Sequence, residues 1–254
     1  MSAAVPLRVE HRGHRLYCAM ALAPGARVDL PEAAGHHAAR VLRLAVGDEV
    51  TLFNGNGGEF AARLERIDAR TVVVRIEAWR DAERESPLAV TLVQGLASGD
   101  RMDYAIQKAV ELGAVAVRPV TTLHSVGRLD APRAEKRVAH WQQIAIAACE
   151  QCGRNRVPVV WPLRDLIAWL GEPSRAVLRL LLSPDASATL ASLPAPAGPI
   201  ECLVGPEGGL DAREAATALH AGFVPVRAGP RMLRTETAGA AALAALNALW
   251  GDWR

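Results

Sequence analysis

The stretch Cys202-Leu203-Val204-Gly205-Pro206-Glu207-Gly208-Gly209-Leu210 runs from an apolar strand into a glycine-rich turn. Asp211 and Glu214 then follow three residues apart, which is the spacing of a capping box and predicts that a helix begins at Asp211. A glycine-rich turn between a strand and a helix lets a ligand approach the backbone at the carboxyl end of a parallel sheet. The turn has neither the G-x-G-x-x-G pattern nor the Lys-Ser/Thr of a P-loop, so nothing here favours NAD or a nucleoside triphosphate. A tight turn that binds no ligand is the alternative interpretation.

Strand-like and helix-like patterns alternate around this turn, from Pro87 to the end of the chain. Short apolar runs predict strands at residues 88–93, 114–120, 157–161, 177–182, 200–204 and 223–227. Apolar residues three and four positions apart predict helices at residues 100–112, 133–151, 211–220 and 235–250. Such alternation is typical of a parallel sheet with helices on both faces, so the predicted fold class is α/β.

The first part of the chain has a different pattern, with short strands and tight turns. Strands are predicted at residues 50–53, 59–64 and 71–76, a turn at 54–58, and one helix near 31–43. This combination is typical of a small β-barrel. Residues 81–87 are charged, end in proline and lack periodicity, so they are the predicted linker. We therefore expect one domain over residues 1–80, with 1–14 as an extension, and a second over 88–254.

Two further polar segments lie at ends of predicted elements. Arg227 to Thr237 follows a strand, precedes a helix, and brings together Arg231, Arg234 and Glu236. Helix capping by Thr235, with Glu236 near the positive end of the helix dipole, would explain the threonine and the glutamate of this segment. It does not explain the arginines. Glu150 to Arg156 ends the helix over 133–151, where polar groups could meet a substrate or form a solvated cap with Gly153.

Composition excludes several classes of protein. Half of the 254 residues are hydrophobic and 22% are charged, which is typical of a globular protein and not of a disordered chain. No apolar run has the length of a membrane helix, and the N-terminus lacks the apolar core of a signal peptide, so we expect a cytoplasmic protein without membrane contact. Cys149 and Cys152 form a C-x-x-C, but no second pair or nearby histidines complete a zinc site. The seven histidines show no H-E-x-x-H spacing.

Basic residues are unevenly distributed although the net charge is only +2. From Arg118 to Arg156 there are seven basic residues against three acidic ones. A local basic excess on a nearly neutral protein favours a surface for a polyanion, and a solvated helix face explains it equally well.

Several motifs together resemble the RsmE family of RNA methyltransferases. They keep one order along nearly the whole chain, from about Arg15 to Asp252, which makes them more specific than any single motif. The motifs are His36–Arg43, Val46–Asp48, Gln107–Gly113, Glu150–Arg156, Gly205–Leu210 and Gly229–Thr237. Two positions depart from the family pattern: Ala228 replaces an expected leucine, and Ala238 replaces a second threonine.

The resemblance implies a PUA-like β-barrel followed by a SPOUT-type parallel sheet with a C-terminal trefoil knot. It implies S-adenosyl-L-methionine as cofactor, no metal, and a homodimer with the cofactor site close to the dimer interface. The implied reaction is methylation of N3 of a uridine, uridine 1498 in the family, in 16S rRNA of the 30S subunit. The implied cofactor-binding residues are Leu182, Ser183, Val204, Gly205, Pro206, Glu207, Gly208, Gly209, Ala228, Gly229, Leu233 and Arg234.

Methylation of uridine N3 requires removal of a proton or stabilisation of the uracil anion. Arg231 or Arg234 is the candidate for stabilising negative charge or anchoring phosphate, and Glu207 or Glu236 is the candidate base, unless each only orders a loop. The candidate RNA-binding residues are Arg40 and Arg43 in the barrel and Arg154, Asn155 and Arg156 after the basic helix.

Two alternatives stay open from the sequence. The first is another SPOUT methyltransferase, which would act on a ribose 2′-hydroxyl or a guanine; the barrel-first order and Glu150–Asn155 argue against it. The second is a non-catalytic RNA-binding assembly factor, which the intact glycine loops and the Arg234–Thr237 run disfavour.

Overall fold

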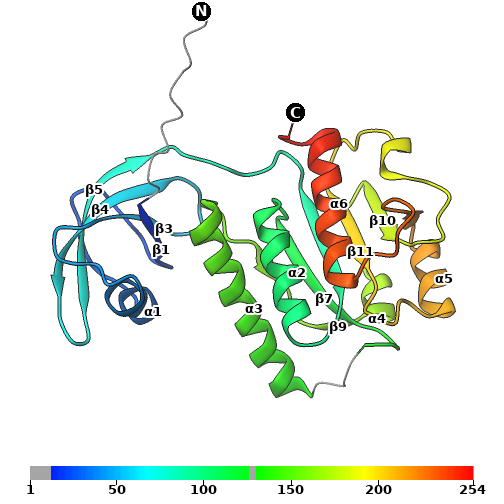
Figure 1. Ribbon diagram of the computed structural model, residues 1–254, viewed down its shortest axis with the longest axis horizontal. Helices are drawn as coiled ribbons and strands as arrows, with labels where there is room; N and C mark the ends of the chain where they lie inside the picture. The colour runs from blue at the N-terminus through cyan, green and yellow to red at the C-terminus, as the bar shows by residue number, and fades with distance from the viewer. Residues whose placement is uncertain (1–12, 126–129, 254) are drawn as a thin grey trace, which may run out of the picture. The chain divides into compact units, whose positions relative to one another are not determined.

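The computed structural model describes residues 13–125 and 130–253, so the predicted extension over 1–14 lies almost wholly outside the described residues. The chain divides into two compact units (Figure 1). The first ends at Arg84 and also includes the short segment Gly153–Arg156. The second contains Glu85–Cys152 and everything from Val157 onward.

The first unit is built on a five-stranded sheet. Its strands are β1 (His14–Tyr17), β2 (Arg27–Asp29), β3 (Glu49–Phe53), β4 (Glu59–Ile67) and β5 (Val72–Arg80). They are ordered β1-β3-β4-β5-β2, and only the β1–β3 pair is parallel. The predicted helix near 31–43 forms as α1 (Glu32–His36), which continues as a π-helical turn over His37–Val41.

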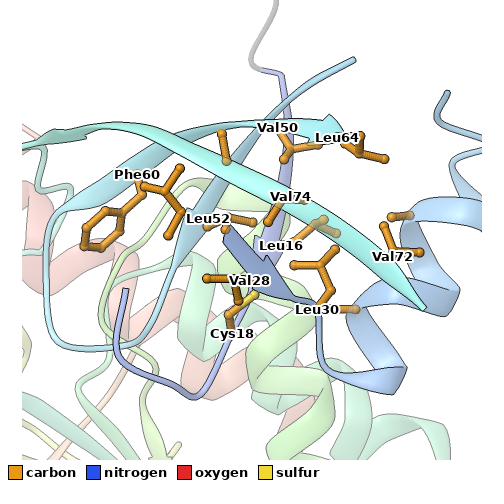
Figure 2. Packing of buried hydrophobic residues seen from close by; sticks show 14 residues of the cluster. Leu16, Cys18, Val28, Leu30, Val50, Leu52, Phe60, Leu64, Val72 and Val74 are labelled. Atoms are coloured by element: carbon orange, nitrogen blue, oxygen red, sulfur yellow. The ribbon is translucent and has the colours of Figure 1, made fainter. Parts of the chain in front are cut away.

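Alternating side chains of these strands form one core. Figure 2 shows Leu16, Leu52 and Val74, from three different strands, gathered on the inner face of the sheet. All three are fully buried. Inward apolar residues at every second position are what a half-buried strand provides, so the alternation seen in the sequence gives this core directly.

The second unit has a parallel sheet of seven strands. They are β6 (Val90–Gly95), β7 (Ala116–Thr121), β8 (Val159–Val160), β9 (Arg164–Asp165), β10 (Leu178–Leu182), β11 (Ile200–Val204) and β12 (Val224–Val226). The order is β12-β10-β11-β6-β7-β8, with β9 also paired to β7. Strand β11 therefore lies between β6 and β10, although both precede it in the chain.

Helices cover both faces of this sheet. They are α2 (Asp100–Glu111), α3 (Ala131–Cys152), α4 (Leu166–Leu170), α5 (Ala212–His220) and α6 (Thr235–Trp250), with a 3-10 turn at Leu190–Ser192. Figure 1 shows α2 between α3 and α6, and α6 packs on β6 and β11. Leu92 of β6 faces Gly239 of α6, whereas the next residue, Val93, joins the core under α4 and α5. Successive residues of a strand point to opposite faces, so a continuous apolar run serves both layers.

The predicted strands and helices are confirmed with small shifts of their ends. Five short elements were not predicted: β1, β2, β9, α4 and the 3-10 turn at Leu190–Ser192. The capping box at Asp211 and Glu214 is present. Thr235 does not cap α6, because the N-cap is Arg234, which makes no side-chain capping bond. Thr235 instead uses its hydroxyl in a long-range contact described below.

Candidate cofactor site at the ends of the parallel strands

Three neighbouring strands end side by side where the cofactor loops are predicted. Leu181 pairs with Leu203, and Leu182 pairs with Val226, so β10, β11 and β12 reach the same edge of the sheet. The Ser183 amide continues the ladder by donating to the Val226 carbonyl at 3.0 Å. The loops that contain Ser183, Gly205 and Ala228 therefore begin next to one another. This edge is the carboxyl end of the sheet, where ligands of α/β proteins commonly bind.

The turn after β11 packs so closely on β6 that side chains are excluded. A Cβ added to Gly95 would lie 2.6 Å from the Pro206 nitrogen, and one added to Gly205 would lie 3.3 Å from Gly209. Gly209 has φ +68° and its amide donates to the Pro206 carbonyl at 2.9 Å. The result is a narrow turn with accessible backbone, which suits a ligand that approaches peptide groups directly.

A buried polar chain fixes this turn to the start of α6. Gln94 is fully buried at the end of β6, and its Nε2 donates to the Thr235 hydroxyl at 2.8 Å and to the Gly95 carbonyl at 3.1 Å. The Thr235 hydroxyl donates onward to the Gly205 carbonyl at 2.6 Å. Gln94 was not predicted as a site residue, although a glutamine at the end of an otherwise apolar strand is a recognisable signal, because buried amides require partners.

The Glu207 side chain in this turn is held in place by three hydrogen bonds. Its Oε1 accepts hydrogen bonds from the Ser98 amide at 3.0 Å, the Ser98 hydroxyl at 2.8 Å and the Arg101 guanidinium at 2.9 Å. Burial by itself would raise the pKa of Glu207, but these bonds and its own backbone amide lower that pKa to about 2. A carboxylate stabilised to this degree is a weak base, so the geometry favours loop ordering over proton transfer.

Glu236 differs from Glu207 because one of its oxygens has no partner. Its Oε2 is buried and accepts no hydrogen bond from any described residue, and the same holds for Gln94 Oε1. Both groups belong to the same edge, Gln94 at the end of β6 and Glu236 in the first turn of α6. Gln94 Oε1 faces α6, because a Cβ added to Gly239 would lie 3.6 Å from it. Buried acceptors without donors are costly, so the unpartnered Glu236 oxygen at the start of α6 fits a site that a donor-bearing ligand completes.

The remaining residues of the third loop are more open. Arg231 and Arg234 are exposed, Ala228 and Leu233 are half-buried, and Gly229 has φ +81°. The nearest group to a Cβ added to Gly229 would be the Arg231 guanidinium, at 4.0 Å. The two predicted arginines are thus accessible to an incoming anion.

A fourth loop packs on the glycine turn and was not predicted. A Cβ on Gly208 would lie 2.7 Å from the Cβ of His124, which follows β7. The neighbouring Leu123 amide donates to Glu214 Oε1 at 2.8 Å, and the other Glu214 oxygen accepts the Asp211 amide at 3.0 Å. The capping box of α5 therefore also anchors the loop after β7.

The predicted RNA-binding residues fall into two groups. Arg40, Arg43 and Arg156 are exposed, whereas Arg154 is 3% and Asn155 0% exposed. Asn155 Oδ1 accepts from Arg15 Nη2 at 2.5 Å, and Asn155 Nδ2 donates to the Ala82 carbonyl. Burial of Arg154 and Asn155 weighs against direct RNA contact and indicates that they organise the first unit.

Asn155 is one part of a buried ionic cluster inside the first unit. Arg15 Nη1 lies 2.5 Å from Glu59 Oε2, and both side chains are less than a tenth exposed. Burial would raise the pKa of Glu59, but hydrogen bonding and charge from Arg15, together with Arg84, lower it. Arg84 also donates to the Gly153 carbonyl at 3.0 Å. Segment 153–156 is thereby attached to the strands of the first unit.

Neither a cluster of metal ligands nor a membrane-spanning helix is found among the described residues. Within residues 13–125 and 130–253, no three His, Cys, Asp or Glu side chains are grouped so that they could hold a metal ion. In the same part of the chain, no helix is both long and apolar enough to cross a bilayer. Cys149 of the C-x-x-C is buried within α3.

Comparison with known proteins identifies the class to which this fold and site belong. The family model described as "RNA methyltransferase domain" matches residues 84–247, and the one described as "RNA methyltransferase PUA domain" matches residues 30–77. The chain is thus an RNA methyltransferase with a parallel α/β fold and an N-terminal PUA-like domain. It belongs to the RsmE family, the ribosomal RNA small subunit methyltransferases E.

Individual relatives match over nearly their full length. Ribosomal RNA small subunit methyltransferase E of Bacillus subtilis is 33% identical, with 84% of this chain and 86% of the relative covered. A crystal structure of the enzyme from Neisseria gonorrhoeae bound to S-adenosyl methionine has a TM-score of 0.89 and 41% identity, and covers 95% of this chain and 100% of the other. A methyltransferase from Legionella pneumophila, solved in complex with the same cofactor, has a TM-score of 0.91 and 38% identity, covering 95% and 99%.

Proposed function

We propose that this chain transfers the methyl group of S-adenosyl-L-methionine to N3 of a uridine in 16S rRNA, at the position equivalent to uridine 1498. The observation that carries the proposal is the convergence of three loops, after β10, β11 and β12, at one edge of the sheet. Those loops contain the motifs of the RsmE family. Their glycines leave backbone accessible, and a buried carboxylate oxygen of Glu236, in the first turn of α6, lacks a donor.

The residues present fit the cofactor. Backbone groups of Gly205, Gly208 and Gly229 would hold its adenosine end, with Leu182, Ser183 and Leu233 beside them. When bound, S-adenosyl-L-methionine supplies an electrophilic methyl group on a sulfonium. The rigid Gln94–Thr235–Gly205 chain keeps the turn in one conformation, so that ordering the loop costs little when the ligand binds.

The chain's own charged groups would prepare the uracil. Uridine N3 carries a proton and becomes a good nucleophile only when that proton leaves. Glu236 is the better placed candidate base, because Glu207 is committed to Ser98 and Arg101. Arg231 or Arg234 would stabilise the developing negative charge or hold a neighbouring phosphate.

The two units are proposed to have different functions, one in RNA binding and the other in cofactor binding. The PUA-like unit, with Arg40, Arg43 and Arg156 exposed, would bind rRNA, and the parallel-sheet unit would hold the cofactor. The position of β11 between β6 and β10, and of β10 between β11 and β12, is consistent with the trefoil knot of SPOUT proteins. We also propose a homodimer, which light scattering would test, acting in the cytoplasm where ribosomes are assembled.

The test is methyl transfer to defined substrates. The purified protein would be incubated with labelled S-adenosyl-L-methionine and either unmethylated 30S subunits or free 16S rRNA, and the RNA digested for mass spectrometry. We expect labelled 3-methyluridine from at least one substrate, and no incorporation of label into subunits that already carry that modification. Label in a 2′-O-methyl nucleoside or in guanine would show that the methylated atom is not uridine N3. Cofactor binding without any transfer would contradict the proposal that 16S rRNA is the substrate.

A further inference from the structure

A basic stripe runs along the exposed side of α3 in the second unit. Arg133, Lys136, Arg137 and His140 are all exposed and line one open hollow of about 530 Å³. Their spacing of three, four and seven residues places them on one face of the helix. The stripe covers about 10 Å of helix axis at 1.5 Å per residue. Three of these residues contribute to the basic excess between Arg118 and Arg156, but none of the four is among the candidate RNA-binding residues named from the sequence.

Local ion pairs leave much of this charge uncompensated. Arg133 lies 3.7 Å from Asp130, and His140 Nε2 lies 3.0 Å from Asp103 Oδ2. Lys136 and Arg137 form no ion pair with any described carboxylate. Like charges three or four residues apart destabilise a helix slightly, so the helix itself gains nothing from this clustering. The clustering of these basic residues is therefore better explained by a ligand outside the helix than by the stability of the helix itself.

The stripe is presented on a rigid support. On the other side of α3, Trp141 is 1% exposed, and its Nε1 donates to Asp103 Oδ1 of α2 at 3.1 Å. Asp103 thus holds both Trp141 and His140, and it connects α3 to α2. Ala145 and Ala148 continue the buried face. A row of basic side chains on a well-packed helix pair is suited to a ligand with repeated negative charge.

We propose that the α3 stripe, defined as Arg133, Lys136, Arg137 and His140, is a docking surface for the phosphate backbone of the substrate rRNA. The inference rests on the proposed function, because the ligand is taken to be the RNA that is methylated. The stripe carries no Phe, Tyr or Trp side chain for base stacking, and three of its four side chains are Lys or Arg. We therefore expect it to position RNA through phosphates and not to read its sequence.

The test compares two double variants with equal loss of charge. Lys136→Ala/Arg137→Ala removes the two unpaired cations of the stripe. Arg175→Ala/Arg213→Ala is the matched control, because both arginines are exposed in the same unit and form no ion pair with described residues. Filter binding of 30S subunits and of a 16S rRNA fragment would be measured over a range of KCl concentrations. KM for the subunit, kcat and cofactor affinity would be measured in parallel.

We expect the stripe variant to bind RNA about tenfold more weakly, with a salt slope smaller by roughly 1 to 2, since each phosphate contact contributes about 0.7 to 0.9 to that slope. Its KM should rise while kcat and cofactor affinity stay unchanged, and the control should resemble the wild type. Equal behaviour of the two double variants would overturn the proposal, as would wild-type protein that binds no RNA. If the wild type binds RNA in this stripe-dependent way but transfers no methyl group, the docking surface stands and the proposed function fails.

Discussion

The Thr235 hydroxyl lies 2.6 Å from the Gly205 carbonyl and joins the first residue of α6 to the glycine turn after β11. Thr235 is 6% exposed and also accepts the Gln94 amide at 2.8 Å, so three elements meet at one hydroxyl. A hydroxyl can accept and donate at once, which no apolar residue of the same shape can do. The orientation of the Gly205 peptide therefore depends on a side chain 30 residues away.

Replacing Thr235 with valine should damage both stability and cofactor binding. Thr235→Val keeps the shape but leaves the Gly205 carbonyl and a Gln94 N–H without this partner, and each buried polar group left unsatisfied costs about 1–3 kcal/mol. Thr235→Ser keeps the hydroxyl and serves as the matched control. Calorimetric titration with S-adenosyl-L-methionine should show at least a tenfold weaker Kd for the valine variant and a small change for serine. Equal affinities of the two variants would show that the contact does not order the site.

Gly95→Ala tests the close approach between β6 and the turn. The added methyl would lie 2.6 Å from the Pro206 nitrogen, which is backbone and cannot move without displacing the turn. Overpacking of this kind costs about 1–3 kcal/mol. Gly171→Ala is the control, because its nearest contact would be an ordinary 3.5 Å. We expect the melting temperature to fall by several degrees, and cofactor binding to be lost, only for Gly95→Ala. A fully active Gly95→Ala protein would contradict this close approach of β6 and the turn.

Glu207 should make a pH-dependent contribution to stability. Its pKa of about 2 in the fold lies below the ordinary 4.5, so the folded state binds fewer protons than the unfolded state. The contribution is therefore fully present above about pH 4.5 and is lost as the pH falls toward 2. Because Glu207 is an exposed residue, solvent screening reduces the contribution to about 1 kcal/mol. Urea unfolding should give a free-energy difference between wild type and Glu207→Gln at pH 6 that shrinks steadily as the pH falls from 4.5 toward 2; a difference that stays constant would argue against the ion pair.

The sequence predicted most of the second unit because its apolar runs and helical periods are long and uninterrupted. The capping box at Asp211 and the glycine turn followed from residue types alone, since few other residues tolerate those backbone conformations. Contacts between distant segments could not be predicted in this way. Thr235 fits the pattern of an N-cap, and only the packing of α6 on β11 brings its hydroxyl to Gly205. Asn155, read as a surface residue at a helix end, is enclosed by residues more than 70 positions away in the chain.

The buried cluster of the first unit gives a stability prediction. Arg15→Met should leave Glu59 charged and buried beside only Arg84, and breaking a buried pair from one side costs about 3–5 kcal/mol. Arg27→Met is the control, because the Arg27–Glu65 pair at 2.7 Å is formed by a largely exposed arginine and should contribute about 0–1 kcal/mol. Hydrogen exchange of amides in β3, β4 and β5 should accelerate strongly only for Arg15→Met. Similar protection of these amides in both variants would mean that the buried cluster contributes little to the stability of the first unit.

Substitution of Arg231 should affect catalysis without affecting the stability of the fold. Arg231 is exposed and close to Gly229, so its removal should not disturb the core. If its guanidinium stabilises the uracil anion or a phosphate beside it, Arg231→Ala should lower kcat by about 10²–10³-fold, the usual effect of losing one electrostatic stabiliser. Arg227→Ala, an exposed arginine earlier in the same loop, is the control. A loss of kcat in Arg231→Ala with unchanged cofactor affinity and melting temperature would assign a role in the transition state. A higher KM for the subunit with unchanged kcat would instead assign phosphate anchoring, and unchanged turnover would remove Arg231 from the mechanism and direct attention to Arg234.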